Sequence, residues 1–160
     1  MSGHAFEQHD HHSCIADGVT AAVAYCAEHK LQFTKTRKRV LEILLERHRA
    51  MGAYEILDRL REEGLGSQPP VAYRALDFLV TNGFAHRIER LNAFIACTHV
   101  ESGHAPAFLI CRSCERVVEA ETDLGAGELA RAAAATGFVI ERTVREAEGL
   151  CPDCSPSEVA

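Results

Sequence analysis

The sequence predicts an α+β protein in which an N-terminal winged helix-turn-helix domain precedes a small α/β domain. Four amphipathic helical patterns occupy the chain before residue 83. Two short strand patterns follow, at residues 84–90 and 93–97. The rest of the chain reads as strand, strand, helix and strand. Because helices that end in a β-hairpin are typical of a winged helix, we place the boundary between the domains near residues 98–105.

The first two predicted helices cover residues 17–29 and the segment that follows Thr34. Thr34 is a good N-cap, because its side-chain oxygen can accept a hydrogen bond from a backbone N–H of the first turn. Apolar residues then recur at i, i+1, i+4 and i+5, as Val40, Leu41, Leu44 and Leu45.

The third and fourth predicted helices both end at glycines. The third covers about residues 54–63 and ends before Gly64. The fourth starts at Pro69-Pro70, where proline suits the first turn, and ends at Gly83. Its apolar face consists of Ala72, Ala75, Leu76, Leu79 and Val80, and the side chains pointing away from the core are those of Tyr73, Arg74, Asp77 and Thr81.

The predicted hairpin brings together residues that can ligate a metal. With a two-residue turn at Leu91-Asn92, paired residue numbers sum to 183, so His86 lies opposite Cys97. Such partners have Cβ atoms about 5 Å apart, which suits two ligands of one ion. His104 and Glu119 could complete the set, and its thiolate would favour zinc over iron or manganese. Taken singly, His86 reads as a surface residue and Cys97 as a small buried one.

After the domain boundary, the sequence predicts strands at 107–111, 116–121 and 138–147 and a helix at 124–136. The predicted organisation is a disordered His-rich tail (1–16), the winged-helix domain (17–97), a hinge (98–105), the α/β domain (106–154) and a short tail (155–160).

Two C-x-x-C motifs, Cys111/Cys114 and Cys151/Cys154, are the firmest chemical signal. Two such turns supply the four soft ligands of a tetrahedral zinc ion. A pair of redox dithiols is the alternative, but a thioredoxin-like motif opens a helix, whereas Cys111 ends a predicted strand. We expect a structural zinc whose loss unfolds the α/β domain.

Charge is distributed unevenly along the chain. Formal charge is −4 over residues 1–29, +4 over 30–90 and −6 over 91–160. Such asymmetry suggests a basic module, with a nucleic-acid partner, joined to an acidic one. The basic run Lys35, Arg37, Lys38 and Arg39 lies in the first turn of a helix, where the helix dipole also favours phosphate.

No apolar run approaches the roughly 18 residues of a membrane span, and the N-terminus does not read as a secretory signal. We therefore expect a cytoplasmic protein without a membrane partner. The N-terminal His4, His9, His11, His12 and Cys14 could bind metal, although we favour a disordered tail.

Several segments resemble the ferric uptake regulator family, and within it the zinc uptake regulator branch, in unbroken order over about residues 18–154. They include Phe33-Thr34-Lys35-Thr36-Arg37, Ala53-Tyr54-Glu55-Ile56-Leu57, Tyr73-Arg74-Ala75-Leu76-Asp77-Phe78-Leu79, Gly83-Phe84-Ala85-His86-Arg87-Ile88-Glu89 and both C-x-x-C motifs.

The resemblance implies a homodimer that represses zinc-uptake genes by binding a palindromic double-stranded DNA operator. It implies two Zn²⁺ per subunit, a structural one on the four cysteines and a regulatory one on His86, Cys97, His104 and Glu119. His99 could compete with His104 as a ligand, or help form an accessory site with Glu89 and Glu101. The DNA contacts expected are Tyr73 and Arg74 on the recognition helix, Tyr54 before it, and Lys35, Arg37, Lys38 and Arg39.

Two other functions stay open at this point. An iron or peroxide sensor of the same family is disfavoured by the thiolate of Cys97, and a zinc carrier or redox dithiol protein is disfavoured by the exposed Tyr73-Arg74 pair. We expect neither an enzyme nor a small-molecule substrate, because no nucleophile–base pair or phosphate-binding glycine loop is recognisable and the predicted metal ligands leave no open position.

Overall fold

The computed structural model describes residues 11–47, 49–66, 68–97, 106–120 and 127–156. The helices are α1 (His11–Glu28), α2 (Lys35–Leu45), α3 (Ala53–Glu62), α4 (Pro69–Thr81) and α5 (Glu128–Thr136). The strands are β1 (Ala85–Ile88), β2 (Ala93–Ala96), β3 (Ala107–Cys111), β4 (Val117–Ala120) and β5 (Arg145–Gly149). The α+β class is confirmed. None of the helices in these ranges has the length and apolar character needed to span a bilayer.

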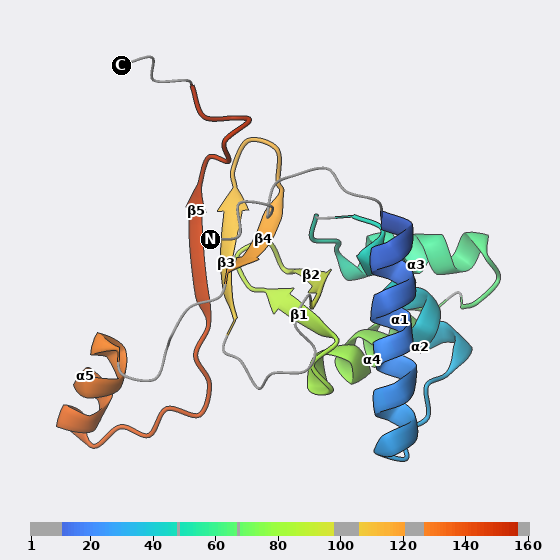
Figure 1. The fold of residues 1–160 in the computed structure, drawn as a ribbon, viewed down its shortest axis with the longest axis horizontal. Helices are drawn as coiled ribbons and strands as arrows, with labels where there is room; N and C mark the ends of the chain where they lie inside the picture. Colours follow the sequence, from blue (N-terminus) through green and yellow to red (C-terminus); the bar gives the residue numbers. More distant parts are fainter. Residues whose placement is uncertain (1–10, 48, 67, 98–105, 121–126, 157–160) are drawn as a thin grey trace.

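Figure 1 shows the hairpin β1–β2 between the helices α1–α4 and the three-stranded sheet, with α5 beyond β5. The sheet has the order β4-β3-β5, with β4 antiparallel and β5 parallel to β3. One apolar core fills the helical half and contains Leu44, Leu57, Leu76 and Phe84. A second, smaller cluster comprises Ile88, Ile95, Phe108, Ile110 and Val117. It buries side chains of the hairpin against side chains of the sheet.

The caps of the helical half follow the sequence closely. Thr34 is the N-cap of α2, and its Oγ1 accepts a hydrogen bond of 3.3 Å from the backbone N–H of Arg37. Prolines occupy the first two positions of α4. Gly64 and Gly83 have φ of +70° and +78° after α3 and α4, a left-handed conformation that glycine adopts without a Cβ penalty.

Helix α1 begins at His11, six residues before the predicted start at residue 17. The prediction of a disordered tail over 1–16 is therefore wrong for residues 11–16, and residues 1–10 lie outside the described part. The cause is an apolar stripe that continues one turn further back. Cys14 and Ile15 are half-buried, as are Gly18 and Val19, so this turn contacts the rest of the helical half.

The hairpin register differs from the prediction. Ala85 pairs with Ala96 and Ile88 with Ala93, so His86 lies opposite Ile95 rather than Cys97. The turn has four residues, 89–92, and Asn92 takes the left-handed conformation with φ +46°. A shift by two residues leaves every side chain on its predicted face, because side chains alternate with period two. His86 and Cys97 therefore still share a face.

Strand β5 covers Arg145–Gly149 rather than the predicted 138–147. It lies at the edge of the three-stranded sheet, where its five residues pair with the five residues of β3. The apolar residues that suggested a longer strand are exposed instead, Phe138 at 67% and Val139 at 80%. They follow Gly137, which ends α5 with φ +70°.

Candidate metal centres and nucleic-acid interface

The four cysteines of the C-x-x-C motifs converge at one end of the sheet. Strand β5 runs parallel to β3 with Gly149 opposite Cys111, so both motifs leave the sheet at the same end. Their sulfur atoms all lie within 4.8 Å of one another, and the Sγ atoms of Cys114 and Cys151 are 3.8 Å apart. A tetrahedral zinc ion with bonds of about 2.3 Å places its sulfur ligands about 3.8 Å apart. The set fits zinc, and all seven cysteines are free thiols.

Backbone N–H groups surround the sulfur of Cys111. Those of Cys114 and Cys151 lower the pKa of the Cys111 thiol to about 6, and the latter donates to its Sγ at 3.4 Å. The neighbouring side chain of Cys151 is the main cause that raises the pKa of Cys154 to about 12. Metal binding requires the thiolate form of each cysteine, and a bound cation would favour that form.

A second cluster joins the hairpin to the sheet. His86 on β1, Cys97 just after β2 and Glu119 on β4 bring their ligand atoms within 4.8 Å of one another. The Nε2 of His86 lies 3.6 Å from Oε1 of Glu119. The side chains of His86 and Glu119 are only 15% and 3% exposed, and Cys97 is 5% exposed. Nitrogen, sulfur and oxygen donors buried together suit zinc.

Some of the predicted metal ligands lie outside the described residues. His104, the predicted fourth ligand, lies outside them, as do His99 and Glu101 of the accessory site. The third accessory residue, Glu89, forms ion pairs with Arg142 and Arg87. The accessory site stays a prediction.

The residues predicted to contact DNA fall into two groups. Tyr54 on α3 and Tyr73 on α4 are 63% and 44% exposed, and Arg74, Lys35 and Lys38 are exposed as well. They come from α2, α3 and α4, which pack against each other. These side chains are available to a ligand the size of a nucleic acid.

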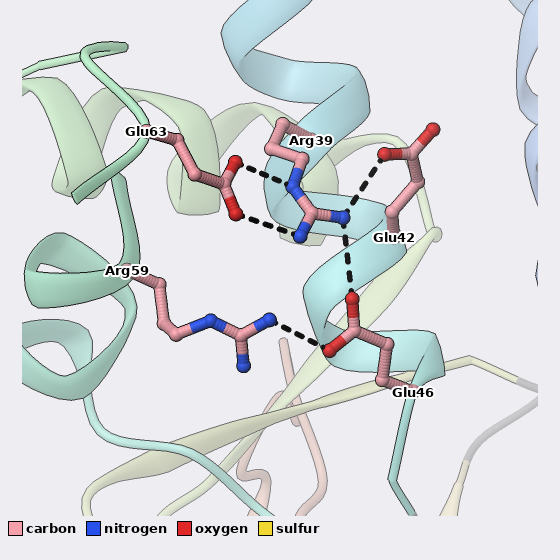
Figure 2. Close-up of polar contacts among 5 residues, drawn as sticks. All are labelled: Arg39, Glu42, Glu46, Arg59 and Glu63. Atoms are coloured by element: carbon pink, nitrogen blue, oxygen red, sulfur yellow. Dashed lines mark hydrogen bonds and ion pairs between the residues drawn. The ribbon is translucent and has the colours of Figure 1, made fainter. Parts of the chain in front are cut away.

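Arg39, also predicted as a phosphate contact, is half-buried and held in a network of ion pairs. Figure 2 shows its guanidinium surrounded by three carboxylates. It donates to both oxygens of Glu63, at 2.6 and 2.8 Å, and to Glu42 and Glu46, each at 3.2 Å. Arg59 of α3 also contacts Glu46, at 2.8 Å. This network, the Arg39 cluster, ties α2 to α3 and engages four of the five N–H donors of Arg39.

Arg37 is also engaged within the protein. Its Nη1 donates to the carbonyl of Gln32, and its guanidinium lies 3.9 Å from the centroid of the Phe78 ring on α4. Such a cation–π contact holds the start of α2 against α4. Of the four basic residues at the start of α2, Lys35 and Lys38 are exposed, whereas Arg37 and Arg39 are half-buried.

Sequence reasoning missed the Arg39 cluster. The spacing of Glu42 at i+3 and Glu46 at i+7 was a visible signal for pairing along one helix face. The third carboxylate, Glu63, lies 24 residues away, and its approach depends on how α3 packs.

Comparisons with known proteins agree with one another. A sequence model of the ferric uptake regulator family matches residues 28–144. The zinc uptake regulation protein of Escherichia coli (strain K12) is 38% identical over 132 residues, which are 81% of this chain and 76% of that protein. The protein of the same name from Shigella flexneri gives the same figures.

Among solved structures, a zinc uptake regulator complexed with zinc and DNA is 35% identical, with a TM-score of 0.81 over 88% of this chain and 94% of that one. Holo XcZur is 40% identical, with a TM-score of 0.78 over 86% and 96%. Apo XcZur is 39% identical and covers 89% and 98%, but its TM-score is 0.51. The arrangement of this chain is therefore closer to the holo form than to the apo form.

Proposed function

The chain belongs to the ferric uptake regulator family, and we propose that it is a zinc-responsive transcriptional repressor of zinc-uptake genes. In this proposal it binds a palindromic DNA operator as a zinc-loaded homodimer. The observation that carries the proposal is the buried convergence of His86, Cys97 and Glu119 from the hairpin and the sheet. A metal bound there reports on how the two halves are arranged.

Two zinc ions per subunit are proposed. Cys111, Cys114, Cys151 and Cys154 hold a structural ion that ties the chain after β5 to the end of β3. His86, Cys97 and Glu119, with His104 as fourth ligand, hold the regulatory ion. Zinc supplies no redox chemistry in either place. At the regulatory site, the binding energy of zinc stabilises the arrangement in which the hairpin contacts the sheet.

The proposed DNA-binding domain extends from α1 through the hairpin, with α4 as the recognition helix. Tyr73 and Arg74 are exposed on α4, and an arginine can bind guanine O6 and N7 with both donors. Tyr54, Lys35 and Lys38 supply further contacts, of which the lysines bind phosphates. Arg37 and Arg39 are assigned a different role, which is to hold α4 and α3 against α2.

The proposed homodimer forms through the outer face of the sheet and the region of α5. Large apolar side chains are exposed there: Leu109, Leu129, Phe138, Val139, Val144 and Leu150. Helix α5 has no buried residue at all within the described chain. Monomeric proteins rarely leave so many apolar side chains of one region in water, so a second copy of the chain is the proposed cover.

The response to zinc is a population shift between orientations of the two halves. Ligands on β1, after β2 and on β4 converge only while the hairpin lies against the sheet, so that arrangement has the higher affinity for the ion. The same arrangement fixes the spacing of the two recognition helices in the dimer, which must match half-sites one or more helical turns apart. Zinc and operator then strengthen each other's binding by the same factor.

The proposal is tested by selecting duplexes from a random DNA library with the dimer, in zinc-replete buffer and after removal of the regulatory zinc by mild chelation. We expect enrichment of a palindrome only in the zinc-replete arm, with near-complete loss of affinity for that palindrome on chelation. Enrichment that is equal in both arms, or absent from both, would refute a zinc-responsive repressor. The structural zinc content is measured in each arm as a control.

A further inference from the structure

Three side chains form a row across one face of the sheet, the face that meets the hairpin. Phe108 on β3 lies opposite Glu119 on β4 and opposite Glu146 on β5. Residues opposite one another on adjacent strands project to the same face. Phe108 contributes to the buried cluster with Ile88 and Ile95 of the hairpin, and its ring centroid is 5.4 Å from that of His86. The row therefore carries a carboxylate on each side of an apolar centre.

Strand β1 and its turn run along this row. At one end His86 contacts Glu119. At the other end, the two oxygens of Glu146 accept hydrogen bonds from the backbone N–H groups of Glu89 and Arg90, at 2.6 and 2.9 Å. Three residues of strand advance about 10 Å, which matches two strand spacings of about 4.8 Å. The geometry thus lets one short strand reach both carboxylates.

The hydrogen bonds of Glu146 are made with the turn of the hairpin. The ladder between β1 and β2 ends at Ile88 and Ala93, so the N–H groups of Glu89 and Arg90 take no part in it. A carboxylate that receives both of them makes two charge-assisted hydrogen bonds, each roughly twice as strong as a neutral one. Glu146 belongs to the sheet and the turn to the hairpin, so these bonds exist only while the two are in contact.

We propose that Glu146 is a positioning residue for the zinc response: it holds the turn 89–92 against the sheet and so sets how much zinc is needed to reach the DNA-binding arrangement. The proposal rests on the proposed function of the site formed by His86, Cys97 and Glu119. Glu146 and the metal ligands stabilise the same contact from opposite ends of β1. By thermodynamic linkage, loss of Glu146 weakens zinc binding at the regulatory site and operator binding in the same direction.

The test compares the full-length dimer with the variants Glu146→Gln, which keeps one acceptor oxygen, and Glu146→Ala, which keeps none. Glu148→Gln and Glu148→Ala are matched controls. Glu148 lies two residues along β5, on the same face, and forms an exposed ion pair of 3.3 Å with Arg90. Two quantities are measured without DNA: the affinity of the regulatory site for zinc, by chelator competition, and hydrogen exchange of the amides of residues 89 and 90.

We expect Glu146→Ala to weaken regulatory zinc binding on the order of tenfold and to speed exchange of both amides, with Glu146→Gln in between. The Glu148 variants should change zinc affinity by less than about twofold. Unchanged zinc affinity in Glu146→Ala overturns the proposal, even if the amides exchange faster. If Glu146→Ala loses its structural zinc or no longer forms a dimer, Glu146→Gln takes its place. Unchanged zinc affinity in Glu146→Gln would then overturn the proposal. If zinc binding responds as expected while the wild-type dimer ignores DNA, the proposed function fails and the role of Glu146 stands.

Discussion

The imidazole of His86 and the carboxylate of Glu119 face each other at 3.6 Å, although the two residues belong to separate sheets. Neither sheet could create this contact alone. Any ion that uses both side chains must therefore link the hairpin to the three-stranded sheet, and its removal frees them to separate. Mutagenesis can test whether this link controls zinc-dependent DNA binding.

Cys97→Ser should remove the regulatory zinc and abolish zinc-dependent DNA binding, because a serine hydroxyl is a poor zinc ligand beside a thiolate. Metal content should fall from two zincs to one per subunit, while dimer mass and far-UV spectrum stay unchanged. Cys26→Ala is the matched control, since Cys26 is a buried cysteine of α1 in the helical core and should keep both ions. Full zinc-dependent binding by Cys97→Ser would contradict the assignment.

Cys151→Ser should unfold the sheet half and dissociate the dimer. Structural zinc sites contribute on the order of 10 kcal/mol of apparent binding energy, more than a small sheet can replace. The helical half should survive, because its core contains no residue of β3, β4 or β5. A partial loss of far-UV signal together with a monomer in sedimentation checks this. Cys14→Ser serves as control, and a native dimer of Cys151→Ser would rule out the structural role.

Glu63→Gln should lower the free energy of unfolding at neutral pH by about 1 kcal/mol or less, the range of partly exposed ion pairs. Its hydrogen bond with Arg39 lowers the pKa of Glu63 below the ordinary value of 4.5. The stabilisation is thus present above that pH and disappears as the pH falls through the lowered value. Wild type and variant should therefore converge in acid denaturation curves. As a control, Glu62→Gln changes an exposed neighbour and should match the stability of the wild type at every pH.

Lys38→Gln and Arg39→Gln should differ in how DNA binding depends on salt. Each phosphate contact contributes about 0.9 to the slope of log affinity against log salt, so losing Lys38 from both subunits should reduce the slope by about 1.8. Arg39→Gln should weaken binding through helix position and leave the slope unchanged. Operator titrations at several salt concentrations measure both. An equal reduction of slope in both variants would return Arg39 to the phosphate contacts.

Leu109→Asp should dissociate the dimer. Leu109 is 42% exposed on the central strand β3, on the face opposite Phe108, and each dimer would bury two introduced charges. We expect the dissociation constant to rise on the order of 100-fold, as measured by sedimentation. Tyr54→Asp, an equally drastic change at a 63% exposed position of α3, should leave the dimer intact. A stable Leu109→Asp dimer would place the interface elsewhere.

Local signals in the sequence were sufficient for the start of α2, for both ends of α4 and for the two cysteine motifs. Thr34, the prolines of α4 and Gly83 act through their own backbone or side-chain chemistry, which a single sequence displays. The C-x-x-C motifs likewise carry their metal geometry within four residues. The hairpin register was wrong because the turn Glu89-Arg90-Leu91-Asn92 has no strong turn dipeptide, and its length depends on Asn92 adopting a positive φ.

Contacts between distant segments could not be predicted from the sequence. The role of Arg39 depends on Glu63, and that of Glu146 on the backbone of the turn 89–92. Neither partner is visible from spacing, because each pair forms only after two elements pack. The correct face of His86 and Cys97 was still predicted, since an error of two residues preserves the alternation of a strand.

The position of the second cysteine motif after β5 determines when the four-sulfur site is complete during synthesis. The first cysteine motif ends β3, but the second follows β5, which comes after every other described element. During synthesis the helical half can fold as soon as its own residues have left the ribosome, since domains generally fold in that order. The four-sulfur site is complete only when the second motif emerges. Binding of the proposed structural zinc is therefore a late step in the maturation of each subunit, and dimers should assemble only from chains that have completed it.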